Sequence, residues 1–123
     1  MKKKVLVVER DEDILFVIRH ILEDQGFEVG VSRTEEGIVQ RVIAEMPDIV
    51  LLDIIKPTEA GKALCNALKL VDSIKHIPVI VLSTYPQIQK ENIECANEVV
   101  DKPFDASEIV NIINEHLLSS AHM

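Results

Sequence analysis

The sequence predicts an α/β fold in which helices cover both faces of a five-stranded parallel β-sheet. Short apolar runs alternate along the chain with longer segments whose apolar residues recur at three- and four-residue steps. A strand that is apolar throughout, rather than at every second residue, is typical of a parallel sheet buried on both faces. Strict alternation of such strands with amphipathic helices indicates right-handed crossovers within one domain.

The predicted strands are the apolar runs, bounded by charged, proline or turn-forming residues. They cover residues 4–8, 27–32, 49–52, 79–82 and 98–100. The run 49–52 lies between Pro47 and Pro57 and leads directly into Asp53. We therefore expect Asp53 at the carboxyl end of a central strand, where parallel sheets carry their sites.

The predicted helices each carry one apolar side. The first follows an acidic loop at 9–13, the second begins at Thr34, the third covers 59–71, and the last opens at Asp105 with Glu108 in a capping box. Their inward residues are expected to be Ile14, Val17, Ile18, Ile21 and Leu22; Ile38, Val42 and Ile43; Ala63, Leu64, Ala67, Leu68 and Val71; and Ile109, Ile112, Ile113, His116 and Leu117. The segment 83–97 has a weaker helical pattern. We expect a domain at 1–118 and a tail at 119–123.

Composition narrows the class of protein. Thirteen basic against twenty-one acidic residues give a net charge of −8, which argues against direct binding to nucleic acid or anionic membranes and favours a protein partner. Cys65 and Cys95 are isolated, so reduced thiols are expected rather than a disulfide scaffold or a zinc site. The apolar run 5–8 is too short for a signal sequence or a membrane span, which predicts a cytoplasmic protein.

Four polar residues each follow a predicted strand directly: Glu9, Asp53, Ser83 and Lys102 come after the first, third, fourth and fifth strands. Parallel strands bring those ends to one edge of the sheet, where the four side chains would form a small polar site. Asp53 is the natural nucleophile or anchor of such a site. The alternatives are a turn-initiating aspartate at 53 and an acidic helix amino terminus at 9–13.

The segments VLVVERDEDIL, PDIVLLDIIKPTEAG, VIVLS and DKPF resemble the signature segments of two-component response-regulator receiver domains. The resemblance implies a flavodoxin-like (CheY-like) fold and phosphorelay signalling. It implies that Asp53 is the phosphoacceptor, Ser83 the switch hydroxyl and Lys102 the lysine that contacts the phosphoryl group. The implied partners are a histidine kinase or phosphotransfer protein and a downstream output protein or appended domain. Such a domain is no true enzyme and at most catalyses its own phosphorylation and dephosphorylation.

In the family an acidic pair after the first strand helps the phosphoacceptor to hold Mg²⁺, which implies Glu9 and Asp53 as metal ligands. Here the two positions are Glu9 and Arg10. An inward Arg10 about 5 Å from the metal would cost roughly 6 kcal/mol of repulsion at an effective dielectric near 20. Arg10 could instead point to solvent, with Glu9 or Asp11 supplying ligands. Both arrangements remain open at this point, and so does Mg²⁺ binding.

Two other functions compete with the phosphoacceptor reading. In a phosphorylation-independent pseudo-receiver, Arg10 would pair with Asp53 and the fold would act as an interaction module; Val99, where an aromatic switch residue is common, also favours this. An enzyme of similar fold fits less well. A flavodoxin needs a hydroxyl- and glycine-rich loop in place of ERDED, and a haloacid-type phosphatase needs a second acid where Ile55 stands.

Overall fold

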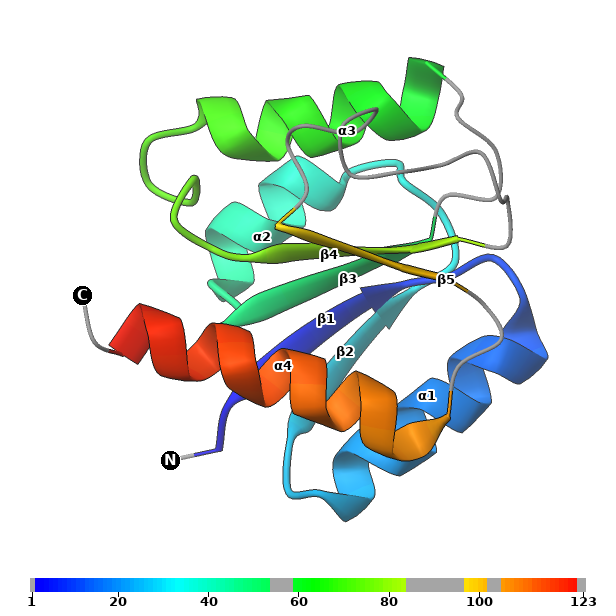
Figure 1. Ribbon diagram of the computed structural model, residues 1–123. Coiled ribbons are helices and arrows are strands. Elements are labelled where there is room, and N and C mark those ends of the chain that lie inside the picture. Colours follow the sequence, from blue (N-terminus) through cyan, green and yellow to red (C-terminus); the bar gives the residue numbers. More distant parts are fainter. Residues whose placement is uncertain (1, 54–58, 84–96, 102–104, 122–123) are drawn as a thin grey trace.

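The computed structural model describes residues 2–53, 59–83, 97–101 and 105–121, in which five strands and four helices are found. The strands form one parallel sheet in the order β2-β1-β3-β4-β5 (Figure 1), which is the flavodoxin-like order. The predicted fold class is confirmed. The elements in chain order are β1 (Lys4–Val8), α1 (Glu12–Asp24), β2 (Glu28–Ser32), α2 (Ile38–Glu45), β3 (Ile49–Asp53), α3 (Glu59–Leu70), β4 (Val79–Ser83), β5 (Glu98–Asp101) and α4 (Ala106–Ala121).

Helices cover both faces of the sheet, with α2 and α3 on one face and α1 and α4 on the other (Figure 1). Strand β1 shows why both faces must be covered. Leu6 and Val8 pack toward α2 and α3, whereas Val5 and Val7 pack toward α1 and α4, and all four are buried. Because successive strand residues point to opposite faces, an apolar run without alternation supplies two cores at once.

Helix α1 is rotated about its axis relative to the prediction. It buries Leu15, Ile18 and Leu22. Val17, predicted to face inward, is half exposed, and Phe16 is 66% exposed. Residues 14–18 are apolar without a break, so several stripes at helical spacing fit them equally well. Packing against the sheet decides which stripe is buried.

Helix α2 begins at Ile38 rather than at Thr34, which corrects the predicted start. The Thr34 hydroxyl accepts a hydrogen bond from the Glu36 amide at 2.9 Å and so forms a turn in place of a helix. Gly37 follows with a φ of 73°, a left-handed conformation that glycine adopts without steric cost. Ile43, predicted to face inward, is 44% exposed. The helix ends at Glu45 with Met46 as its C-cap, so Met46 and Pro47 stop it as predicted.

The predicted cap of the last helix is present. The Glu108 amide donates a hydrogen bond to Asp105 Oδ1 at 2.8 Å, and this bond, with a second from the Ser107 hydroxyl, lowers the pKa of Asp105. Helix α4 continues to Ala121, so residues 119–121, which we expect to belong to the tail, are helical. The weaker helical segment predicted after β4 lies almost wholly outside the described residues.

Cys65 is fully buried on α3, among the side chains that pack α2 and α3 onto the sheet. It is disulfide-bonded, so the prediction of reduced thiols is wrong for this residue. The other cysteine of the chain, Cys95, lies outside the described residues. Sequence spacing is a poor guide here, because a disulfide requires only that the folded chain bring two α-carbons within about 7 Å.

Candidate functional site

The carboxyl ends of β1 and β3 lie side by side. Val8 pairs with Leu52 in the register of the two strands, so the next residues along each chain segment, Glu9 and Asp53, stand at neighbouring positions on the same edge. Neighbouring strands are about 4.8 Å apart. The prediction that these two acidic residues are brought together from distant parts of the sequence therefore holds for their backbone positions.

The ends of β4 and β5 complete this edge of the sheet. Asp53 pairs with Leu82, which places Ser83 one step further along the neighbouring strand, and Ser83 pairs with Asp101, the last residue of β5. Lys102 comes next in the chain and lies outside the described residues. The strand ends thus meet as the sequence predicts, while the roles of Asp53, Ser83 and Lys102 stay predictions.

Glu9 is buried, with only 1% of its surface exposed, and it is the one charged residue in the buried set of the described chain. Its backbone amide donates a hydrogen bond to the Ser32 carbonyl at 2.9 Å, which ties it to the end of β2. Keeping a carboxylate inside a protein costs free energy unless other groups compensate the charge. A buried carboxylate at the carboxyl edge of a parallel sheet therefore marks a candidate functional site.

The Arg10 side chain forms an ion pair with Glu35. Its Nη2 atom donates to both carboxylate oxygens of Glu35, at 3.1 and 3.0 Å, in the turn that precedes α2. The Arg10 side chain is 59% exposed. Of the two arrangements open to the sequence, the structure has the outward one. The pseudo-receiver depends on an Arg10–Asp53 pair, whereas the partner of Arg10 among the described side chains is Glu35.

Asp11 acts as the amino-terminal cap of α1. Its Oδ1 atom accepts hydrogen bonds from the Asp13 and Ile14 amides, at 2.9 and 3.1 Å. For this residue the helix-terminus interpretation of the acidic loop is correct, and the same oxygen is not free to bind a metal. Within the described residues, no three side chains of ligand type form a cluster that could hold a metal ion. Glu9 and Asp53 remain the candidate carboxylates.

Arg33, at the end of β2, is a site neighbour that the sequence analysis missed. Its Nε and Nη2 atoms donate to the Arg10 carbonyl at 3.4 and 3.2 Å, and its Nη1 lies 3.9 Å from a Glu12 carboxylate oxygen. These contacts hold the loop between β1 and α1. No motif in the sequence marks Arg33, because its role depends on β2 lying beside β1.

Comparison with known families gives a direct assignment. A model of the response regulator receiver domain matches residues 5–114. The chain belongs to this family. The receiver domain is thus homologous to the phosphoaccepting domains of two-component response regulators, which are phosphoacceptors rather than true enzymes. Nothing in the comparisons favours the pseudo-receiver.

Individual relatives agree with this assignment. The nitrogen assimilation regulatory protein NtrX of Azorhizobium caulinodans is 28% identical, over all of this chain and 28% of its own length. The phosphate regulon regulatory protein PhoB of Rhizobium meliloti is 30% identical, over 89% of this chain and half of its own. The receiver domain thus spans half or less of these relatives.

Solved structures resemble the receiver domain along nearly its whole length. The CheY-like receiver domain protein of Methanospirillum hungatei has a TM-score of 0.86 and 24% identity, covering 99% of this chain and 98% of its own. The signal receiver domain of a histidine kinase from Syntrophus aciditrophicus has a TM-score of 0.81 and 25% identity, covering 95% and 91%. At 24% identity, the similarity to the Methanospirillum hungatei protein shows that the fold is shared and nothing about function.

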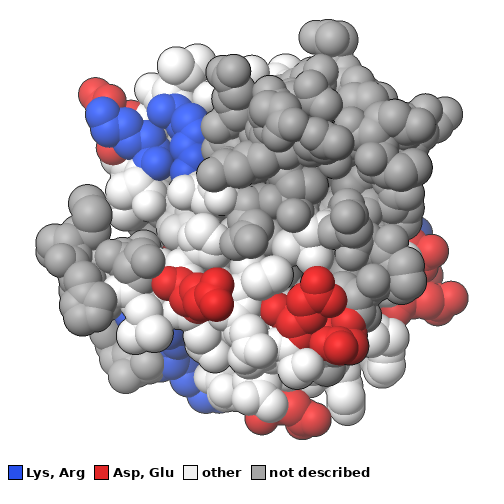
Figure 2. Space-filling view, in the orientation of Figure 1, with Lys and Arg blue, Asp and Glu red and all other residues white. Residues whose placement is uncertain are grey.

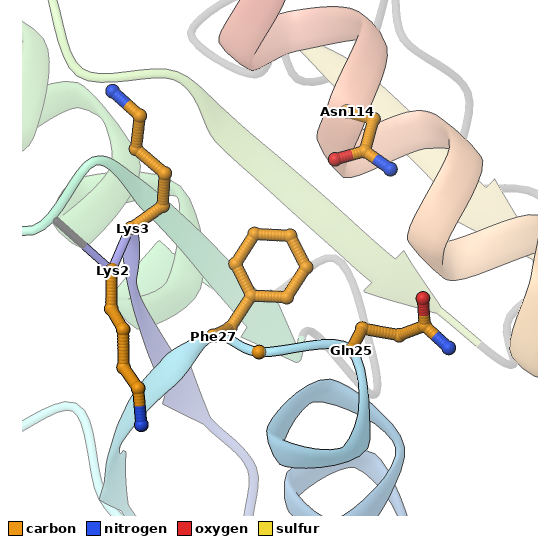
Figure 3. Close-up of a pocket in the computed structure, with 6 residues that line it drawn as sticks. Lys2, Lys3, Gln25, Phe27 and Asn114 are labelled. Carbon is orange, nitrogen blue, oxygen red and sulfur yellow. The ribbon is translucent and has the colours of Figure 1, made fainter.

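The opposite edge of the receiver domain carries a hollow of about 590 Å³, lined by Lys2, Lys3, Gln25, Phe27 and Asn114 among others. Figure 3 shows Lys2 and Lys3 extending in opposite directions, with the Phe27 ring to one side of both. The two ammonium groups therefore do not converge on a common anion. Among the described residues that line this hollow, the polar side chains do not converge as a specific small-molecule site requires.

Surface charge in the receiver domain fits its acidic composition. On the face shown in Figure 2, acidic side chains lie over α4, whose exposed residues include Glu108 and Glu115, and the described basic side chains form no continuous surface there. The described helices include none that is long and apolar enough to cross a membrane.

Proposed function

We propose that this receiver domain accepts a phosphoryl group on Asp53 from a partner histidine kinase or phosphotransfer protein. An Asp53 carboxylate oxygen attacks phosphorus, and the bond from phosphorus to the donor nitrogen breaks. The electron pair of that bond leaves with the donor imidazole, and an aspartyl phosphate is formed. The observation that carries the proposal is the juxtaposition of Asp53 with the buried Glu9 at the ends of β3 and β1.

Ser83 and Lys102 are proposed to serve the same site. The transferring phosphoryl group spreads negative charge over its equatorial oxygens, and cations and hydrogen-bond donors stabilise that charge. Ser83 ends the strand next to Asp53 and can supply a hydroxyl donor. Lys102 follows β5 directly in the sequence and can supply an ammonium.

Mg²⁺ fits the donor set at this edge. The ion prefers oxygen ligands and is commonly held by one or two carboxylates together with waters and phosphate oxygens, as Glu9 and Asp53 would allow. Before phosphoryl transfer, Arg10 pairs with Glu35, so its charge is balanced there and does not oppose a metal at the two carboxylates. When bound, Mg²⁺ would neutralise charge on the phosphoryl oxygens. We propose Glu9 and Asp53 as its protein ligands.

The proposed partners are a kinase or phosphotransfer protein on the input side, and an output protein or appended domain on the other. The relatives named as regulatory proteins are about twice as long as this chain or longer, which supports an output beyond the receiver domain. We also propose that the only reactions this domain catalyses are its own phosphorylation and dephosphorylation.

Intact-mass spectrometry tests the phosphoacceptor. The domain is incubated with acetyl phosphate or phosphoramidate, with and without Mg²⁺, beside Asp53→Asn and Glu9→Gln variants. We expect a gain of one phosphoryl group in the wild type and none in the Asn variant, with Glu9→Gln needing more Mg²⁺ for the same yield. An equal gain in the Asn variant, or no gain in the wild type with either donor, would contradict the proposal.

A further inference from the structure

In the Arg10–Glu35 ion pair, the backbone of Arg10 is held in place, whereas the side chain of Arg10 is exposed. Arg33 donates two hydrogen bonds to the Arg10 carbonyl, so the backbone of this loop is braced. The Arg10 side chain is 59% exposed, and among the described side chains it pairs with Glu35, which is 24% exposed. The guanidinium is therefore the part of this contact that can move without disturbing the strands.

Arg10 is also within reach of the proposed phosphoacceptor. It follows Glu9, and Glu9 stands beside Asp53 at the ends of adjacent strands. Neighbouring strands are about 4.8 Å apart. The long, flexible side chain of Arg10 begins one residue after Glu9, at the carboxyl edge of the sheet. Rotation about its side-chain bonds is the movement that would carry the guanidinium from Glu35 toward Asp53.

We propose that Arg10 exchanges Glu35 for the phosphoryl group once Asp53 is phosphorylated, an inference that rests on the proposed function. Before transfer, Asp53 and Glu35 each carry a single negative charge. An aspartyl phosphate carries more, by analogy with the charge of about −1.5 to −2 on other phosphorylated side chains. It also offers several oxygens to the planar guanidinium, which binds phosphate through paired hydrogen bonds. The stronger anion then takes Arg10 from the weaker.

The exchange of partners by Arg10 would change the structure of the turn that precedes α2. Glu35 lies in the turn that precedes the helix, where its carbonyl accepts a hydrogen bond from the Ile38 amide at 3.3 Å. Loss of Arg10 leaves a mostly buried carboxylate without its cation, and such a group must gain water or a new partner. The turn from Thr34 to Gly37 is therefore where the phosphorylated state would differ from the unphosphorylated one.

The competing explanation is a static brace, in which the ion pair only holds two loops together. The two explanations predict different directions for the shift that removal of each charge causes in the phosphorylation equilibrium. In an exchange, Glu35 competes with the phosphoryl group for Arg10, so removal of the Glu35 charge favours the phosphorylated state and removal of Arg10 disfavours it. If the pair is only a brace, removal of Arg10 and removal of the Glu35 charge disrupt the same contact. Both changes then shift the phosphorylation equilibrium in the same direction.

The test uses beryllofluoride, which mimics the phosphoryl group on a carboxylate, at one constant Mg²⁺ concentration. Binding is followed by NMR, including the side-chain Nε–H signal of Arg10. We expect Glu35→Gln to bind beryllofluoride about threefold more tightly than the wild type, as the loss of one partly exposed ion pair allows. Arg10→Ala is expected to bind about tenfold more weakly, because a charged hydrogen bond is lost. Arg10→Lys should recover part of that loss.

The matched controls are Arg19→Ala and Glu23→Gln, which break an exposed arginine–glutamate pair on α1 and should leave binding unchanged. Opposite shifts in Glu35→Gln and Arg10→Ala, with a displaced Arg10 Nε–H signal, support the exchange. Shifts in the same direction, or none, overturn the exchange alone. A wild-type domain that binds no beryllofluoride overturns the proposed function and the exchange together.

Discussion

The Lys69 ammonium on α3 donates a hydrogen bond to the Asn97 side-chain oxygen, 2.9 Å away and directly before β5. It also donates to the Ile77 carbonyl at 2.8 Å, two residues before the start of β4. The same Asn97 oxygen accepts a hydrogen bond from the Val79 amide at 2.9 Å. One lysine thus joins a helix to the beginnings of two strands, and its partial burial lowers the pKa of Lys69.

Replacement of Lys69 by Met should lower the free energy of unfolding by about 1–2 kcal/mol, because the partly buried Ile77 carbonyl loses the Lys69 donor and the Asn97 oxygen loses one of its two donors. Urea unfolding at neutral pH measures the loss. Lys75→Met is the control: its pair with Asp72 is exposed, so a change below about 0.5 kcal/mol is expected. Equal losses in the two variants would show that the Lys69 contacts contribute nothing specific.

Glu45 should give the fold a pH-dependent contribution. Hydrogen bonds from Lys4, at 2.6 Å, and from Arg41 lower the pKa of Glu45 below its ordinary value. A lowered folded-state pKa adds stability above the unfolded-state value, and that stability is lost as the pH falls through the folded-state pKa.

Glu45→Gln should therefore cost about 1 kcal/mol at neutral pH. The deficit relative to the wild type should shrink in urea unfolding carried out between about pH 7 and about pH 3. Glu23→Gln, in an exposed pair, serves as the control. A deficit that stays constant over this range would mean that the charge of Glu45 is not what matters.

Asp11 should affect helix stability but not the metal. Asp11→Ala removes the cap of α1 and is expected to cost about 1 kcal/mol, whereas Asp11→Ser should keep most of the stability because serine also caps. Mg²⁺ affinity, measured by titration and NMR, should be the same for both variants and the wild type. A large loss of Mg²⁺ affinity in Asp11→Ser would instead make Asp11 a metal ligand.

Ile113 on α4 should be among the costly positions in the core. Its side chain is fully buried between α4 and the sheet, so Ile113→Ala is expected to lose about 2–5 kcal/mol of unfolding free energy through lost contacts and a cavity. Leu118→Ala on the same helix removes a 62% exposed side chain and should change stability by less than about 0.5 kcal/mol. Similar values for both would mean that α4 is not docked as described.

Regular structure was predicted best where the pattern of residues allowed a single solution. The strands follow from apolar runs ended by proline or charge, and their observed bounds agree within about one residue. The continuous apolar run at 14–18 allowed several helical phases, and Val17 was wrongly placed inward. Thr34 and Gly37 formed a local turn that the helical pattern of the segment had concealed.

The candidate site also has one part that the sequence predicts and one part that it does not. The order of strands and polar residues along the chain was sufficient to predict that Glu9 and Asp53 share an edge, because parallel strands with helical crossovers bring their carboxyl ends together. The direction of Arg10 could not be predicted, since it depends on Glu35, which reaches the same loop only when β2 lies beside β1. The sequence by itself thus determined the fold class and the residues that meet at the edge of the sheet. The tertiary structure decided which charges pair there, because an ion pair between distant segments depends on distances that no local pattern encodes.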